Sequence, residues 1–231
     1  MKLDFEALFD PSQVLDNVDV LLEGALTTLQ LSALSVVFAA MVGVLLSVLR
    51  SSPWRTVRGA TRIYIELIRG TPLLVQMYIL YYGLPSMGIT LSPMTAAALA
   101  LAQNSGAYVG EILRTAIAAV PKAQGEASRA VGMGYLETQF RIIYPQALPI
   151  ALPSLMGEVI DIVKWSAIGS IVVVPEATQV VTQIVAQSYR GFAIMFLSLA
   201  LFYLVLTGTL ALASRWLEKR LTRHRIKLIH A

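Results

Sequence analysis

Cysteine is absent from the chain, and charged residues make up only 14% of its 231 residues. A soluble domain averages about 25% charged residues. The lack of cysteine excludes disulfides and thiolate metal sites, and it leaves the redox compartment open. The two histidines, His224 and His230, lie in a strongly basic tail, where solvent- or lipid-facing side chains are a simpler interpretation than metal ligands. We therefore expect no metal site.

Two long stretches, residues 24–49 and 191–214, contain no charged side chain. Each exceeds the roughly 20 residues that a helix needs to cross a bilayer. The net charge of +4 comes from lysines and arginines at the edges of such stretches, so a nucleic-acid partner is not expected. The sequence predicts an integral membrane protein that crosses the membrane several times.

An all-α fold with five transmembrane helices accounts for the remaining pattern. The predicted spans are residues 25–49, 63–82, 94–120, 150–174 and 192–213, the second being interrupted at Gly70, Thr71 and Pro72. Residues 83–93 are rich in turn-forming residues and are expected to form a loop. Residues 176–190 are expected to form a partly helical loop. The domain boundaries are an acidic N-terminal segment, 1–23, a membrane domain, 24–214, and a basic tail, 215–231.

The distribution of charge predicts how the chain is oriented. Lysine and arginine favour the cytoplasmic side of a membrane. The connections after the first and third spans and the tail after the fifth are all basic, and the N-terminal segment is acidic with a short interfacial helix around Phe5, Leu8 and Phe9. The acidic segment lacks the basic start and apolar core of a signal peptide. These features predict an N-terminus outside, a C-terminus inside and a cytoplasmic loop at residues 121–149.

This loop has the character of two short helices joined by a bend. Helix-forming residues from Glu126 to Ala130 are followed by Gly132 and Gly134, and prolines at 145, 149 and 153 mark the entry into the next span. The stretch resembles the loop of membrane subunits in binding-protein-dependent ABC importers, whose pattern is Glu-Ala-Ala, three residues, Gly, nine residues, Ile, one residue, Leu-Pro. The matching positions are Glu126, Ala127, Gly132, Ile142 and Pro145, with Ser128 and Tyr144 as departures.

The resemblance extends from about residue 24 to residue 207. Five further stretches resemble the polar amino acid uptake branch of this family, whose members carry histidine, glutamine, arginine or opines. They are Arg69-Gly-Thr-Pro-Leu-Leu-Val-Gln76, Tyr82-Gly-Leu-Pro85, Gly106 to Glu111 with Arg114, Val120 to Gln124, and Pro145 to Pro149. We expect Arg69, Gly70 and Pro72 to be structural.

The resemblance implies the type I ABC importer permease fold in a bacterial cytoplasmic (inner) membrane. It implies an identical or homologous second permease subunit, two cytoplasmic ATPase subunits that bind ATP and Mg, and an extracytoplasmic solute-binding protein. It further implies that Glu126 contacts the ATPase and that Gly132 permits the bend, while Ala127 and Ala130 are small enough for close approach. Membrane lipid surrounds such a subunit.

Polar residues inside two predicted spans form candidate pathway faces. Charges in a membrane are costly and are usually functional. One face comprises Gln103, Asn104, Glu111 and Arg114, and the other comprises Glu158, Asp161, Lys164, Trp165 and Ser166. Glu111 with Arg114, and Asp161 with Lys164, can instead be internal ion pairs. Relatives have Asn-Glu and Lys-Asp-Thr-Ser-Leu around these positions, and Asp161 adds an acid. The excess of acid favours a cationic substrate head group, with a zwitterion left open.

Other classes of function fit less well. The chain has no G-x-x-x-x-G-K-[ST] phosphate loop, so it is not expected to be an enzyme or to hold a cofactor, and ATP hydrolysis is assigned to a separate subunit. No nucleophile and base with an oxyanion site stand out. A gradient-driven secondary transporter of small polar solutes is the alternative, but five spans without a visible internal repeat argue against it.

Overall fold

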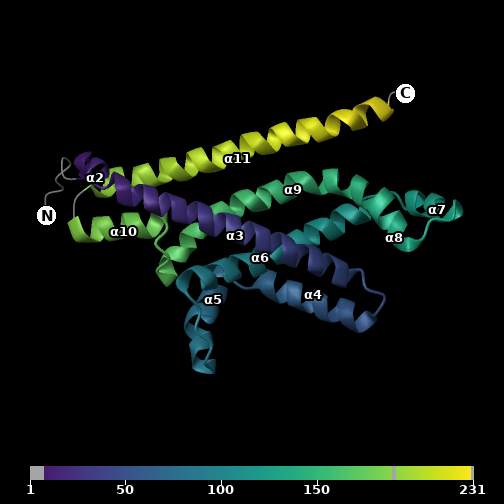
Figure 1. The fold of residues 1–231 in the computed structure, drawn as a ribbon, viewed down its shortest axis with the longest axis horizontal. Helices are drawn as coiled ribbons and strands as arrows, with labels where there is room; N and C mark the ends of the chain where they lie inside the picture. Colours follow the sequence, from purple (N-terminus) through teal and green to yellow (C-terminus); the bar gives the residue numbers. More distant parts are fainter. Residues whose placement is uncertain (1–7, 189–190, 230–231) are drawn as a thin grey trace. The chain divides into compact units, whose positions relative to one another are not determined.

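The structure is a computed structural model that describes residues 8–188 and 191–229, with the side chains of 221–229 outside the description. Every regular element in the described residues is helical (Figure 1). The chain divides into two compact units. Unit 1 comprises Met1–Phe38, Thr71–Ala102 and Asp161–Thr209, and unit 2 comprises Ala39–Gly70, Gln103–Ile160 and Leu210–Ala231. The predicted all-α fold is confirmed.

The first half of the chain contains the elements that the hydropathy pattern predicts, with shifted ends. α2 (Ser12–Leu15) precedes α3 (Val18–Arg50), which begins seven residues earlier than the predicted span and so includes part of the acidic segment. The helix expected around Phe5, Leu8 and Phe9 lies largely outside the described residues. α4 (Arg55–Gly70) and α5 (Leu73–Tyr78) follow, and then a π-helical turn, η1 (Ile79–Gly83), and a 3₁₀ turn, η2 (Leu84–Met87).

The second half contains the polar loop and the last two long helices. α6 (Pro93–Ala118) leads into α7 (Lys122–Ala130), α8 (Tyr135–Thr138) and a π-helical turn, η3 (Gln139–Ile143). α9 (Tyr144–Trp165) then gives way to a 3₁₀ helix, η4 (Ser166–Val172). The last elements are α10 (Ala177–Ser188) and α11 (Phe192–Ile229). The partly helical loop predicted at 176–190 is therefore helical over most of its described length.

Two predicted spans have helical details that the sequence did not specify. The fourth predicted span, 150–174, is formed by α9 as far as Trp165 and then by the tighter 3₁₀ helix η4. The helix of the fifth predicted span, α11, continues through the basic tail to Ile229. Arginine, lysine and leucine are good helix formers, and no glycine or proline follows Gly208 to end the helix.

Unit 1 is built around a small apolar core. Leu31 of α3, Met77 of α5 and Leu101 of α6 are completely buried together with Val172 and Val174 near the end of η4. Alanines at 97, 98 and 100 bring the α6 backbone close to these neighbours. Burial of such side chains contributes about 1.5–3 kcal/mol for each large one relative to exposure.

Unit 2 is held by close helix contacts that depend on glycine. Leu46 of α3, Ile65 of α4 and Ala107 of α6 form one buried cluster, so that α4 returns against α3 after the turn that follows Arg50 (Figure 1). A β-carbon at Gly43 would lie 2.3 Å from Cγ1 of Val109, and one at Gly106 would lie 2.5 Å from Cγ1 of Val42. Such distances leave no room for a side chain, so these two glycines set the approach of α3 and α6.

Length and composition identify three helices able to cross a membrane in the described residues. They are Val18–Arg50, Tyr135–Val172 and Phe192–Arg220, and α4 with α5 can form a fourth, broken span. The break falls at Gly70, Thr71 and Pro72, as predicted from the sequence. The chain is therefore a multi-pass helical membrane protein.

Candidate functional site

The bend of the 121–149 loop is a hydrogen-bonded helix end. The Met133 amide donates to the Ser128 carbonyl at 3.0 Å, and the Gly132 amide donates to the Arg129 carbonyl at 3.0 Å. This pair of bonds is the Schellman motif, which requires a left-handed residue after the helix. Gly132 supplies it with a φ of +84°. The expected role of Gly132 in the bend therefore has a direct conformational reason.

The side chains predicted for coupling are accessible. Glu126, Ala127, Ala130 and Gly132 are all exposed. Ser128, in contrast, is buried and donates its hydroxyl to the Gln124 carbonyl at 2.7 Å. The residues predicted for coupling are thus exposed around one buried position of α7, Ser128.

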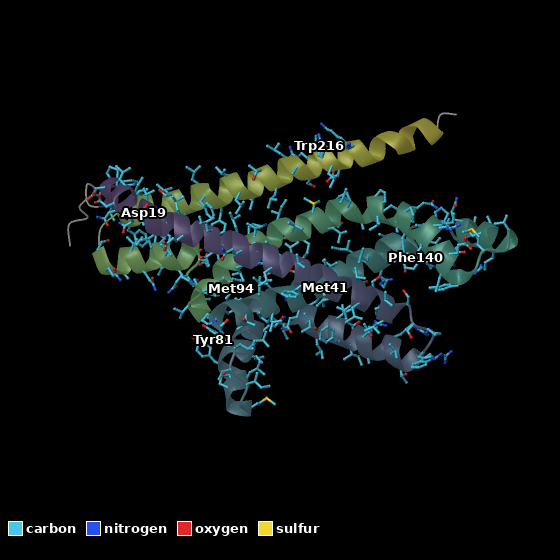
Figure 2. All side chains as sticks on the ribbon, in the orientation of Figure 1. Asp19, Met41, Tyr81, Met94, Phe140 and Trp216 are labelled. Atoms are coloured by element: carbon cyan, nitrogen blue, oxygen red, sulfur yellow. The ribbon has the colours of Figure 1, made fainter. Side chains whose placement is uncertain are left out.

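Within residues 131–140 of this loop, four large apolar side chains that sequence reasoning did not select are also exposed: Val131, Tyr135, Leu136 and Phe140. Val131 is 77% exposed and Leu136 is 68% exposed. Phe140, labelled in Figure 2, packs edge-on against Tyr144 at a ring-centroid distance of 5.2 Å. Large apolar residues that remain exposed on a polar loop are typical of a protein-docking surface. Residue type gave no signal for them, because their exposure follows from how the loop folds.

The polar residues of α6 include one tight ion pair. Nε of Arg114 lies 3.0 Å from both carboxylate oxygens of Glu111. Asn104 is buried, and Gln103 is half-buried. The structure thus brings Glu111 and Arg114 together in unit 2, in the internal pairing that the sequence had left open.

The second group of predicted pathway residues lies along α9 and its end. Lys164 forms an ion pair with Asp161, which is also the internal pairing left open by the sequence. Glu158, on the same helix, is only 7% exposed. Ser166 is completely buried and donates its hydroxyl to the Val163 carbonyl at 2.7 Å. Trp165 is the last residue of α9 and Ser166 the first of η4, so the group spans the point where the helix changes form.

The 3₁₀ segment after Trp165 ends in a strained residue. Val173 has a φ of +63°, and the amides of Val173 and Val174 bond to the carbonyls of Ser170 and Gly169. This is the same hydrogen-bonded end as at Gly132, but with a β-branched residue where glycine is usual. Strain of this kind tends to occur at functional sites.

Unit 2 contains a cavity of about 320 Å³ beside Glu111. Its lining also includes Arg69, Tyr108, Thr115 and Ser154, so α4, α6 and α9 all contribute. The guanidinium of Arg69 lies 4.8 Å from the centre of the Tyr108 ring, a cation–π distance. Glu111 is the only one of the nine predicted pathway residues among the described residues that line this cavity.

The interruption of the second predicted span has its own stabilising contacts. Pro72 precedes the first turn of α5 with an extended backbone (ψ 136°). The side-chain amide Nε2 of Gln76 donates to both the carbonyl and the hydroxyl of Thr71, at 3.1 Å and 2.9 Å. Gly70 is the last residue of α4, and no atom lies within 4 Å of the position its β-carbon would occupy. The contacts at the break are thus made by Thr71 and Gln76, and the structural role predicted for Arg69, Gly70 and Pro72 stays a prediction.

One buried acid was missed by the sequence reasoning. Glu176 is completely buried, and its carboxylate accepts the backbone amides of Thr178 at 2.9 Å and Gln179 at 2.8 Å. It therefore caps the beginning of α10. Burial raises the pKa of Glu176, while these amides and the Tyr203 hydroxyl act in the opposite direction. No group of three histidine, cysteine or acidic side chains suited to a metal occurs within residues 8–188 and 191–229.

Residues 35–223 match the family described as "Binding-protein-dependent transport system inner membrane component". The chain is similar to the L-cystine transport system permease protein TcyB of Bacillus subtilis (strain 168), with 34% identity over 89% of this chain and 88% of that protein. It is also similar to the glutamine transport system permease protein GlnP of Escherichia coli (strain K12), with 34% identity over 92% of this chain and 98% of the relative.

Solved structures give the same result. One titled "Crystal structure of an amino acid ABC transporter with histidines" matches with a TM-score of 0.85 and 34% identity, over 95% of this chain and all of the other. An inward-facing MetNI methionine ABC transporter matches with a TM-score of 0.75 at 19% identity, over 89% and 97% of the two chains. That second match supports the fold alone. The resemblance predicted from the loop motif is confirmed.

Proposed function

Because the chain belongs to the family of binding-protein-dependent transport system inner membrane components, we propose that it forms the membrane pathway of an ATP-driven importer for a polar amino acid or a related compound. The observation that carries this proposal is the similarity to the amino acid ABC transporter over 95% of the chain. The similar permeases for L-cystine and glutamine support the same substrate class.

Members of this family are permease subunits, and the ATPase is a separate subunit. This chain is therefore not an enzyme. In our proposal ATP and Mg are bound only by the partner ATPases, and the chain itself holds no cofactor or metal. A second permease subunit, identical or homologous, completes the pathway, and a solute-binding protein delivers the substrate from outside. Nothing in the family favours a gradient-driven mechanism.

The proposed topology has five spans in a bacterial cytoplasmic membrane, with the N-terminus outside and the C-terminus inside. The spans are α3, α4 with α5, α6, α9 with η4, and α11. α6 is less apolar than the others, but Ala96, Ala97, Ala100 and Leu101 on it are completely buried against protein. A span that faces protein rather than lipid does not need lipid-like side chains all round. The basic connections favour this orientation.

The proposed coupling element is the loop at residues 121–149. Glu126, Ala127, Ala130 and Gly132 would contact an ATPase together with the exposed apolar residues beside them. Closure of the ATPases on ATP would move this loop, open the pathway outward, and reset it after hydrolysis. The support for this assignment is the exposure of α7 and the fixed bend at Gly132.

The proposed substrate pathway runs along the polar faces of α6 and α9. Its members are Gln103, Asn104, Glu111, Arg114, Glu158, Asp161, Lys164, Trp165 and Ser166. We assign the preference for a cationic head group to the two acids of α9, Glu158 and Asp161, of which Glu158 is buried. A carboxylate there would pair with the ammonium or guanidinium group of a substrate.

The test is ATPase activity of the reconstituted complex with its binding protein, across single amino acids and opines. Stimulation by arginine, lysine, histidine or a cationic opine alone supports Glu158 and Asp161 as contacts for the cation. Stimulation by glutamine, glutamate or other non-cationic compounds keeps the importer and rejects the cation site. Uptake driven by an ion gradient without ATP would overturn the importer itself.

A further inference from the structure

Unit 2 contains a second cavity, of about 230 Å³, whose lining is almost entirely charged. Four arginines and two glutamates contribute to it: Arg50, Arg62, Arg69, Arg114, Glu66 and Glu111. The formal charge of these six side chains is +2. A cavity with a net positive charge that is open to its surroundings favours an anion.

The internal ion pairs leave part of this positive charge uncompensated. Nε of Arg62 lies 2.7 Å from Glu66, and Arg114 is paired with Glu111. Within the described part of the chain, no carboxylate lies within ion-pair distance, 4.0 Å, of Arg50 or Arg69. Arg69 instead stacks on Tyr108. Both acids of the cavity are thus already used by other arginines.

Arg50 shows the need for a ligand most directly. Its Nε is buried and has no hydrogen-bond partner among the described residues. A buried donor of a charged group without a partner carries a penalty larger than that of a neutral group. Arg50 is also attracted electrostatically to Glu111, which places its charge at the same cavity. An anion entering from outside the chain would satisfy this donor.

The position of the cavity indicates where the anion comes from. Arg50 is the last residue of α3, and Trp54, in the short turn before α4, is 69% exposed. Tryptophan is enriched at the level of the lipid head groups. On α4 itself, Ile63 and Leu67 are 59% and 62% exposed on the same helix as Arg62. Arginines at the membrane surface beside exposed apolar side chains match an amphipathic ligand.

We propose that this cavity binds the phosphate head group of an anionic phospholipid, with acyl chains along Ile63 and Leu67. Guanidinium groups bind phosphate oxygens through paired hydrogen bonds, and basic pockets between membrane helices on the cytoplasmic side bind anionic lipid head groups. The assignment to the cytoplasmic leaflet rests on the orientation proposed above. Two of the arginines, Arg50 and Arg62, lie outside the proposed substrate pathway and are available for a test.

The experiment uses the complete transporter complex in nanodiscs of phosphatidylcholine with increasing phosphatidylglycerol or cardiolipin. Native mass spectrometry measures the lipids retained, without substrate or ATP. Loss of one arginine near an anionic lipid is worth about 1 kcal/mol, so Arg50→Gln should weaken retention of anionic lipid about fivefold. The double variant Arg50→Gln with Arg62→Gln should weaken it further, and Arg50→Lys should give an intermediate effect.

Arg55→Gln is the matched control, because Arg55 is exposed on α4 and its replacement removes the same charge outside the cavity. This variant should retain as much anionic lipid as the unchanged protein. Equal losses in Arg55→Gln and Arg50→Gln would overturn the proposal, because they would indicate non-specific attraction. Displacement of the lipid by inorganic phosphate or glycerol phosphate alone would also overturn it, in favour of a soluble anion. Either failure leaves the importer function untouched, since that function is judged by substrate-stimulated ATPase activity.

Discussion

The hydroxyl of Tyr203 on α11 donates a hydrogen bond of 3.0 Å to the buried carboxylate of Glu176. That carboxylate already accepts two backbone amides at the start of α10. The backbone amide of Ala177, directly after Glu176 in the chain, donates to the hydroxyl of Thr28 on α3 at 3.0 Å. Three elements of unit 1 are therefore joined through polar groups in a region with little access to water.

Glu176→Ala should destabilise the protein strongly, because it leaves two half-buried amides and the Tyr203 hydroxyl without their acceptor. Each unsatisfied buried group costs about 1–3 kcal/mol. Tyr203→Phe removes only one donor and should cost about 1 kcal/mol. Thermal unfolding of the purified complex measures both. Thr182→Val, which removes an exposed hydroxyl on α10, is the control. A larger effect for Tyr203→Phe than for Glu176→Ala would contradict this account.

Stability should also depend on pH through Glu176. Burial raises its pKa above 4.5, so the folded state binds this proton more tightly than the unfolded state. The stabilisation that comes from this tighter proton binding is fully present below pH 4.5. It is lost as the pH rises from there through the raised pKa of the folded state. Glu176→Gln cannot titrate. The stability of the natural protein relative to Glu176→Gln should therefore fall with rising pH, as measured by melting at a series of pH values. A difference that grows with pH would reject the direction of the shift.

Gly106→Ala and Gly43→Ala should disrupt the contact between α3 and α6. The new methyl group at either position would overlap a valine side chain, and overpacking of this kind costs about 1–3 kcal/mol. Gly59→Ala provides the control, because it lies inside α4 with no atom within 4 Å of the added carbon. There the change should be neutral or stabilising by about 0.5–1 kcal/mol. Similar melting temperatures for all three variants would show that the close contact is not maintained.

The bend at Gly132 gives a test of coupling with a built-in control. Gly132→Ala places a side chain at a φ of +84°, at a cost of about 1–2 kcal/mol, and Gly132→Pro cannot adopt that conformation. Gly134→Ala changes a glycine two residues away whose φ is −69°, and it should be tolerated. We expect Gly132→Pro and Glu126→Lys to uncouple ATPase activity from transport while membrane insertion is unchanged. The measurement is the ratio of substrate delivered to ATP hydrolysed in proteoliposomes, and a normal ratio in both variants would reject the coupling assignment.

The sequence predicted the helical class and the break at Gly70 because both depend on local properties. Long apolar stretches, and a glycine followed closely by proline, act regardless of what surrounds them. The boundaries of α9 and α11 could not be predicted in the same way. Trp165 to Val172 are residues compatible with an α-helix, and the change to a 3₁₀ helix accompanies close packing, with Gly169 against Leu31 of α3. The α11 helix continues because charged residues with high helix propensity follow the apolar ones.

The candidate site likewise contains features set by local sequence and features set by the fold. The spacing of the loop motif identified Gly132, whose backbone conformation depends only on its immediate neighbours. It did not identify Leu136 or Phe140, because their exposure follows from the fold of the loop rather than from residue type. The importance of Glu176 depends on Tyr203, which is 27 residues away in the chain. The pairing of Glu111 with Arg114 was left open by the sequence, since spacing permits an ion pair without requiring it.

The length of α11 has a mechanical consequence. Its 38 residues correspond to about 57 Å of helix, against a hydrocarbon thickness of about 30 Å. A straight helix of this length, with one end at the opposite membrane surface, would extend about 27 Å beyond the hydrocarbon. A tilt of the helix would then displace its far end about twice as much as the point where it leaves the hydrocarbon. A fluorophore near Ile229 would therefore report tilts of α11 at about twice their amplitude at the membrane surface.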